Sequence, residues 1–234
     1  MKKNTDIVLR FSDVRLNYLS GEGESGFSLA LGAGELALFC SDSQKKTPEI
    51  ADLAMGLRRP SSGTIEFLGE DWTRMGAPDL LRNRSQIGRV FAPRGGSNWL
   101  HNLDIDENIM VAQFFRPGQT LATVHERAQE MGQRFGFQVL PHSRPSNASA
   151  EELTKAQWVR AFLPDPLKLL ILERPGYHLT LEQMRPLIQQ IQRVRADGTP
   201  VLWIDYQGDT FERLDVEPTY RFETCPEALS GEFR

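Results

Sequence analysis

Residues 169–175 read Leu169-Leu-Ile-Leu-Glu-Arg-Pro175, and this stretch decides the fold class. Four consecutive apolar residues without alternation are typical of a strand that is buried on both faces, as in a parallel sheet. Further along, residues 181–194 place apolar side chains at helical spacing, and Val201-Leu-Trp-Ile204 is a second buried strand. This strand–helix–strand order predicts an α/β fold with a parallel sheet covered by helices.

The chain on either side of this unit extends the same plan. The other strand patterns are short and apolar, and they lie at 7–11, 14–18, 27–31, 36–39, 64–68 and 87–91, with a further strand from about 220. The other helical patterns lie at 48–57, 78–84, 104–115, 121–136 and 149–163. Because helices dominate residues 92–165, we expect a single domain over 1–234 with a helical insert in its middle.

Composition excludes several classes of protein. Hydrophobic residues make up 40% of the 234 and charged residues 25%, with a net charge of −4, so we expect an ordinary globular chain with no nucleic-acid partner. The sequence has no run of 18 apolar residues, so we expect no membrane span. No apolar signal core follows its first residues. Two cysteines are too few for a disulfide framework, and four scattered histidines predict no zinc site. We therefore expect a cytoplasmic chain.

Several landmarks stand in a recognisable order. The most specific is Ala54-Met-Gly-Leu-Arg-Arg-Pro-Ser-Ser-Gly-Thr-Ile65, and the others are Gly34–Cys40, Asp106–Ile109 and Arg160–Pro166 together with Leu169–Pro175. In this order they resemble the ATP-binding cassette (ABC) ATPase family over about residues 7–215. The resemblance implies a P-loop NTPase-like parallel sheet, an N-terminal antiparallel β subdomain and a helical insert. Residues 96–108 also resemble, more weakly, cassettes of MCE-type lipid transporters.

The phosphate loop that the resemblance implies is altered. Its Lys46 and Thr47 remain, but the family's glycines are replaced by Cys40, Ser43 and Lys45. Glycine allows positive φ and a close approach of the backbone to phosphate. The resemblance makes Lys46 and Thr47 a residual nucleotide site, with Tyr18 stacking on adenine. The alternatives are a plain polar turn, and ordinary strand packing for Tyr18.

The catalytic positions are altered as well. By resemblance, Glu173 and Thr47 would hold magnesium, while Arg174 stands at the general-base position, Ala92 at the glutamine-loop position and Tyr206 at the switch position. An arginine does not accept a proton from water, because its pKa is far above neutrality. The alternative role for Arg174 is an ion pair at the strand end.

The signature region keeps Ser149 but has lost both glycines, and Glu151 would repel a phosphate. As local structure, Ser149 with Glu152 forms a capping box that predicts a helix start. Thr180 stands at the family's aspartate-loop position. No catalytic residue is intact, so no cofactor is established, and ATP and Mg²⁺ remain possible ligands.

Three functions stay open. The first is a non-catalytic ABC subunit, a scaffold or regulator that docks on a transmembrane permease at the membrane and pairs with an active ATPase subunit or with itself, with lipid transport as one cargo class. The second is a divergent, active ATPase subunit, and the third is a free-standing regulatory protein. For docking we single out Trp99, Leu100 and Leu103, apolar residues in a loop. The alternative is that they fill the seam between subdomains.

Overall fold

A computed structural model gives the architecture. It describes residues 7–15, 26–41, 48–93, 98–116, 118–206, 211, 214, 216–224 and 229–230. The strands are β1 (Ile7–Arg15), β2 (Phe27–Gly32), β3 (Leu36–Ser41), β4 (Ser62–Phe67), β5 (Glu70–Asp71), β6 (Ile87–Val90), β7 (Leu169–Glu173), β8 (Val201–Tyr206), β9 (Tyr220–Thr224) and β10 (Leu229–Ser230). The helices are α1 (Pro48–Ala54), α2 (Ala77–Arg84), α3 (Ile105–Met110), α4 (Leu121–Arg134), α5 (Ala150–Phe162) and α6 (Leu181–Ala196), with 3₁₀ turns η2 (Val111–Phe115) and η3 (Pro145–Asn147).

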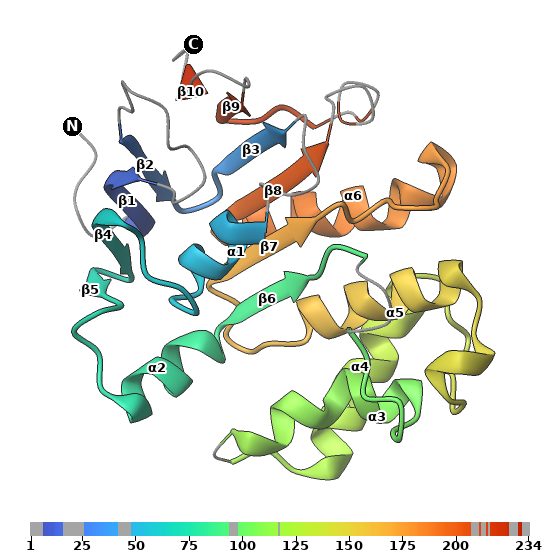
Figure 1. Ribbon diagram of the computed structural model, residues 1–234. Helices are drawn as coiled ribbons and strands as arrows, with labels where there is room; N and C mark the ends of the chain where they lie inside the picture. The colour runs from blue at the N-terminus through green and yellow to red at the C-terminus, as the bar shows by residue number, and fades with distance from the viewer. Residues whose placement is uncertain are drawn as a thin grey trace.

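The strands form two sheets (Figure 1). One has four strands in the order β2-β1-β4-β5, and its pairings are antiparallel. The other has six strands in the order β10-β9-β3-β8-β7-β6, in which β9, β3, β8, β7 and β6 run parallel. The predicted α/β class, with its parallel core and N-terminal antiparallel strands, is confirmed.

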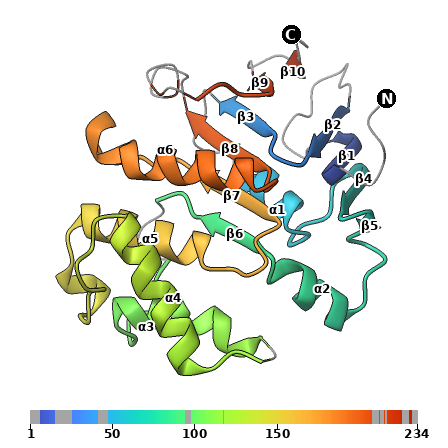
Figure 2. The ribbon, with the colours of Figure 1, turned by 180° about the vertical axis from the view of Figure 1, so that it is seen from behind.

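The larger sheet is buried on both faces. Leu170 and Leu172 of β7 point into a core with α5 and α6, while Leu169 and Ile171 point into a second core with α1 and the small sheet. Figures 1 and 2 show α6 and α1 on opposite sides of β7 and β8. Because every second side chain of β7 enters a different core, the strand has no polar face, which explains its uninterrupted apolar sequence.

Two expected elements differ in detail. The patterns at 7–11 and 14–18 belong to one strand, which is described up to Arg15. The register of this strand shifts between Phe11 and Val14, beside Asp13 with its φ of 46°. Residues 16–18 lie outside the described residues. The helix expected over 104–115 is α3 followed by η2. Arg116 then adopts φ −95° and ψ 135°, the extended conformation favoured before a proline, so the helix ends there.

The segment between β6 and β7 carries α3, α4 and α5, which lie together below the sheet in Figure 1. Phe135, which follows α4, packs against α5, and its ring lies 5.5 Å from Trp158 and 5.4 Å from Phe162 between centroids. That residues 92–165 form an insert within one domain stays our prediction.

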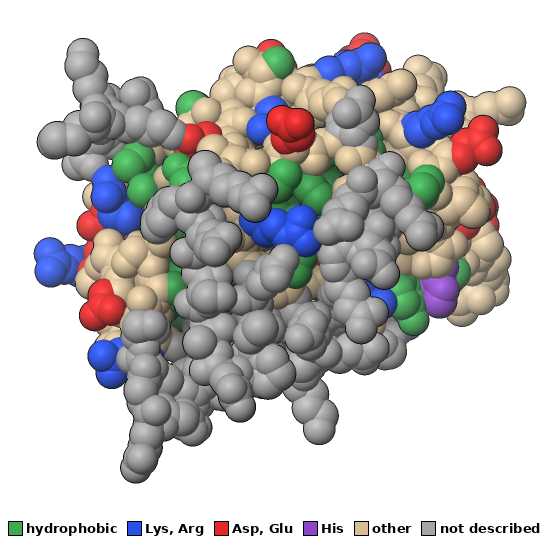
Figure 3. All heavy atoms as spheres, turned by 90° about the horizontal axis from the view of Figure 1, so that it is seen from above, with side chains coloured by type: hydrophobic (Ala, Val, Ile, Leu, Met, Phe, Trp, Pro, Cys, Tyr) green, Lys and Arg blue, Asp and Glu red, His purple; other side chains and the backbone are tan. Residues whose placement is uncertain are grey.

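The face seen in Figure 3 is mixed in charge. In the view of Figure 3, side chains of Lys and Arg are interspersed with those of Asp and Glu over the described part of the face. Among the described helices, none is both long enough and apolar enough to cross a bilayer.

Candidate functional site

The residues predicted for the site come from the carboxyl ends of parallel strands. Glu173 ends β7 and pairs with Ile204 of β8, while Tyr206 ends β8 and pairs with Ser41 of β3. Ala92 follows β6, the neighbour of β7. Ligand sites of open α/β sheets lie outside these strand ends. The structure thus brings the backbones of these predicted positions to one edge, whereas Lys46, Thr47 and Tyr18 lie outside the described residues.

Glu173 is held by a charged partner that the sequence analysis did not identify. Its side chain is 4% exposed, and its Oε1 accepts a hydrogen bond of 2.6 Å from Nε of Arg89 in β6. The same guanidinium donates through Nη1 to Oδ1 of Asp52 in α1 at 2.7 Å and lies 4.6 Å from the ring centroid of Phe91. One buried arginine therefore joins α1, β6 and β7 beneath the strand ends.

This arrangement fits magnesium poorly. Mg²⁺ requires oxygen ligands at about 2.0–2.1 Å in octahedral geometry. A guanidinium hydrogen-bonded to the carboxylate already supplies positive charge at Glu173 and takes up one of its oxygens. Among the described residues, Glu173 is thus part of an ion-pair network rather than of a cation site. We derive no step through a metal.

Arg174 takes an unusual backbone conformation at the end of β7. Its φ is 47°, its N–H donates to the carbonyl of Ile204 at 2.9 Å, and its carbonyl accepts from the N–H of Tyr177 at 3.1 Å. The guanidinium carbon lies 4.3 Å from the Tyr177 ring centroid. A left-handed conformation costs a non-glycine residue about 1–2 kcal/mol, which the turn from Arg174 to Tyr177 offsets. A cation stacked on an aromatic ring thus occupies the position that the resemblance implies for the general base.

Ser149 and Thr180, which the resemblance implies for the signature and the aspartate loop, are helix caps. Ser149 caps α5: its hydroxyl accepts from the N–H of Glu152 at 3.2 Å, and the Glu152 carboxylate accepts from the Ser149 N–H at 2.9 Å. These bonds from Ser149 lower the pKa of Glu152. Thr180 caps α6 in the same way through Gln183, whose amide donates to Glu151 at 2.7 Å. The predicted capping box is confirmed, and the hydrogen bond from Gln183 to Glu151 connects the starts of α5 and α6.

The expected partner surface divides into a buried and an exposed part. Trp99 is 9% exposed, and Arg160 of α5 lies 4.9 Å from its ring centroid. Trp99 is therefore part of the core with α5 and offers little side chain to a partner. Leu100 is 52% exposed, and Leu103 is half-buried. Of the three, Leu100 offers most side chain to a partner.

Arg160 positions this loop from below. It is enclosed between Trp99 and Phe91, and its Nη1 donates to the carbonyl of Asn98 at 2.9 Å. Burial lowers the pKa of Arg160 to about 10, and its Nη2 has no hydrogen-bond partner among the residues that the structure describes. The start of the candidate surface is thus fixed to α5 by a buried cation.

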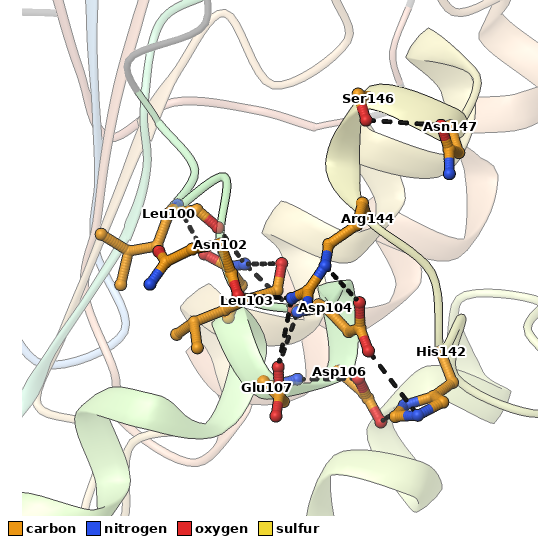
Figure 4. Close-up of polar contacts among 11 residues, drawn as sticks. Leu100, Asn102, Leu103, Asp104, Asp106, Glu107, His142, Arg144, Ser146 and Asn147 are labelled. Carbon is orange, nitrogen blue, oxygen red and sulfur yellow. Dashed lines mark hydrogen bonds and ion pairs between the residues drawn. The ribbon is translucent and has the colours of Figure 1, made fainter.

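A polar cluster fixes the other end of the loop (Figure 4). Asn108 exchanges hydrogen bonds with the backbone of Leu100, at 2.8 and 3.0 Å. His142 Nδ1 lies 3.0 Å from Asp106, and Arg144 Nε lies 3.2 Å from Asp104. The bond to Asp106, with the nearby charge of Asp104, raises the pKa of His142.

The same cluster includes a set of metal-ligand types. Atoms of Asp104, Asp106 and His142 lie within 4.8 Å of one another. Asp104 also accepts from the N–H of Glu107 in the capping box of α3. Because Arg144 and this cap already engage Asp104, the cluster is explained as a joint between the 141–144 segment and α3.

Sequence reasoning missed Arg89, Arg160 and the His142 cluster. Arg89 is a single charge within the buried strand Ile87–Val90, and that burial signals that a partner exists. It does not name Asp52 or Glu173, which are 37 and 84 residues away in sequence.

No family model matches the chain. The lipoprotein-releasing system ATP-binding protein LolD of Gluconobacter oxydans is 28% identical over 222 residues, which cover 92% of this chain and 93% of that protein. The macrolide export ATP-binding/permease protein MacB of Azoarcus is 23% identical over 210 residues, which cover 88% of this chain but 31% of that protein. The comparisons give no support to the resemblance to MCE-type cassettes.

Solved structures agree with these relatives. The dimeric ATP-binding cassette MJ0796, bound to ADP and Pi, superposes with a TM-score of 0.80 over 96% of this chain and 98% of that one, at 16% identity. The CbiO1 subunit of Clostridium perfringens gives a TM-score of 0.75, over 96% and 87% of the two chains at the same identity. In its landmarks, fold and relatives together, the chain is similar to the ATP-binding cassettes of ABC transporters and shares their fold.

Proposed function

We propose that this chain is a non-catalytic cassette subunit, a scaffold or regulator on the transmembrane permease of an ABC transporter. The observation that carries the proposal is Arg174. It follows Glu173 at the carboxyl end of β7, with φ of 47° and its guanidinium over Tyr177. A general base has to accept a proton from the attacking water, and a guanidinium does not do so at neutral pH.

The neighbouring positions support the same proposal. Glu173 is paired with Arg89, and Ser149 and Thr180 use their hydroxyls to cap α5 and α6. The carbonyl of Ala92 accepts from Asn98 at 3.0 Å, and its methyl group offers no ligand oxygen. Each of these residues has a structural role that is complete without nucleotide. We therefore infer selection for the folded shape rather than for turnover.

Nucleotide binding without hydrolysis is compatible with this role. Lys46 and Thr47, with Tyr18, Glu173 and Ser149, are the residues that would form a residual nucleotide site. The same Lys46 and Thr47 favour the second candidate, a divergent but active ATPase subunit. The two candidates differ in turnover, not in binding.

For partners, we propose a permease subunit and a second cassette, either an active ATPase or another copy of this chain. The MJ0796 cassette is a dimer, and the exposed Leu100 supplies an apolar contact for a permease. The chain would then lie on the cytoplasmic side of the membrane through that partner. A lipid or lipoprotein cargo is a narrower proposal that rests on the likeness to LolD.

The deciding experiment measures ATP turnover with Mg²⁺, alone and with the co-expressed permease, together with ATP binding by calorimetry. We expect no turnover by the wild-type chain and none by Arg174→Glu, because the other catalytic positions are also replaced. Magnesium-dependent turnover that Lys46→Ala abolishes would overturn the proposal in favour of the active ATPase. In calorimetry, binding that Lys46→Ala removes would assign the chain a nucleotide-sensing role.

A further inference from the structure

A small cavity lies between α1, β4, the turn after β5 and α2, the elements that gather on one side of the molecule in Figures 1 and 2. Its volume is about 120 Å³. The apolar part of its wall is formed by Leu53, Ile65, Met75 and Leu80, and the two cations that line it are Arg58 and Arg59. The cavity thus combines an apolar wall with positive charge.

Trp72, which also lines the cavity, carries a polar group without a partner. The residue is 6% exposed, and its indole Nε1 is buried and has no hydrogen-bond partner among the described residues. A buried N–H without an acceptor is rare in folded proteins, because the hydration that it has lost is not replaced. The adjacent Thr73 hydroxyl, by contrast, donates to Asp71 at 2.8 Å. The wall therefore includes a donor for which the described chain offers no acceptor.

The indole is held in place by its neighbours. Its ring stacks on that of Phe67, with 5.4 Å between the centroids and 6° between the planes. The guanidinium carbon of Arg84 lies 5.9 Å from the indole centroid, and the same side chain donates to the carbonyls of Met55 and Gly56 at 3.0 and 2.5 Å. Gly56 has a φ of 62°, and a Cβ there would lie 2.5 Å from Cδ2 of Trp72. The cavity is therefore preformed, since both the ring and the loop beside it are fixed.

These features define the chemistry of a ligand. An apolar cavity of about 150 Å³ accommodates a molecule as large as benzene, so the cavity here suits a chain of about four carbon atoms. The indole N–H requires an acceptor, and Arg58 and Arg59 favour a negative charge, while none of the described residues that line the cavity is acidic. A short-chain carboxylate meets all three requirements.

We propose that this cavity binds a short-chain carboxylate. The carbons of the ligand lie against the apolar wall, a carboxylate oxygen accepts from the Trp72 N–H, and its charge is stabilised by Arg59. The inference goes beyond the proposed function and does not depend on whether the chain hydrolyses ATP, because neither nucleotide nor metal takes part in it.

The test uses butyrate as the probe and the full chain at constant ionic strength. Among the indole N–H signals of the four tryptophans, that of Trp72 is the one that disappears from the ¹H–¹⁵N spectrum in Trp72→Phe, which keeps an aromatic ring against Phe67. In the wild-type chain, millimolar butyrate should shift this signal downfield in a saturable manner, since so small a ligand binds weakly. Butylamine, which has the same chain length and the opposite charge, should cause no shift.

Two variants test the parts of the site. Arg59→Gln removes a charge from an exposed position and should weaken butyrate binding about fivefold. Leu80→Phe adds volume at a half-buried wall position and should abolish the shift, whereas Leu81→Phe, an exposed neighbour on α2 that does not line the cavity, should bind like wild type.

Three results would overturn the proposal. They are a Trp72 signal that does not respond to butyrate, a signal that responds equally to butylamine, and unchanged binding in a folded Leu80→Phe variant. If Leu80→Phe does not fold, the exposed Arg59→Gln decides in its place, because equal affinities of this variant and wild type would contradict the proposed contact. ATP turnover by the wild-type chain would defeat the proposed function and leave this result unaffected.

Discussion

Ser149 stabilises the fold as the N-cap of α5. Its hydroxyl accepts from the N–H of Glu152, and its own N–H donates to the Glu152 carboxylate. Both residues are exposed, so the cap stabilises the start of α5 without help from the core. This local pattern could be predicted from four residues of sequence because its partners lie within one helical turn.

We expect Ser149→Ala to lower stability by about 1 kcal/mol, the usual cost of losing a helix N-cap. In a domain of this size that corresponds to a Tm lower by roughly 2–4 °C. Ser146→Ala is the control, since its exposed hydroxyl makes a 3.4 Å contact with the adjacent Asn147. Equal Tm values for the two variants would show that the cap contributes nothing measurable.

Arg89, unlike Ser149, has partners that lie far away in the sequence. Its position in a buried strand predicts a partner, but the partners come from α1 and β7. Their meeting depends on how β6 lies beside β7 and how α1 lies against the sheet, and neither follows from the spacing of residues. Long-range pairs of this kind therefore cannot be predicted from local sequence patterns alone.

The start of α3 shows how neighbouring elements are joined. Arg144 and His142 hold residues 141–144 against Asp104 and Asp106 (Figure 4), and two backbone bonds, from Ile105 to Ser143 and from Asp106 to Pro141, complete the joint. The joint is polar and exposed, so its strength depends on the charge of His142.

The stabilisation from His142 should therefore depend on pH. Because the fold raises the pKa of His142 above its usual 6.5, its contribution is complete below about pH 6.5 and is lost as the pH rises through the raised value. We expect the Tm of His142→Gln to fall below that of wild type at acid pH and to converge with it at alkaline pH. His125→Gln, an exposed histidine on α4, is the control. A Tm difference that does not change with pH would contradict this account.

The contact between β6 and α5 leaves no room for a side chain at Gly88. A Cβ there would lie 1.8 Å from the carbonyl oxygen of Ala161. We expect Gly88→Ala to cost about 3 kcal/mol, the upper part of the usual range for overpacking, because backbone has to move. Gly76→Ala is the matched control, since its Cβ would meet atoms no nearer than 3.8 Å. Denaturant unfolding of the two variants would reveal the difference, and similar midpoints would contradict it.

Element boundaries show where local pattern succeeds and where it fails. The buried strands and α6 could be placed from apolar spacing alone. The expected helix over 104–115 instead ends at Met110 and tightens into η2. The end of η2 depends on the extended conformation of Arg116 before a proline, which competes with the apolar periodicity.

At the scale of the molecule, two cores share one sheet. Leu170 and Leu172 enter the core with α5 and α6, and Leu169 and Ile171 enter the core with α1. This layering could be predicted in outline from the order of strands and helices. The sequence did not predict which loop residues are exposed, since the adjacent Trp99 and Leu100 are both apolar and yet differ in burial.

The whole molecule also supplies the test of docking. If Leu100 contacts a permease, Leu100→Asp should reduce co-purification of the co-expressed permease at least tenfold, because it places a charge in an apolar contact, an effect of about 1.4 kcal/mol or more. Its Tm should stay near that of wild type, since the side chain is exposed. Leu81→Asp on α2, also exposed, is the control. Equal capture by both variants would remove Leu100 from the interface.

The Arg89 network also constrains how such a chain can evolve. One guanidinium satisfies acidic groups on two other elements, so a single substitution at Arg89 disturbs α1, β6 and β7 together. A neutral residue at position 89 is therefore tolerated more easily after Asp52 or Glu173 has itself become neutral. The order in which these three positions can change is restricted for that reason.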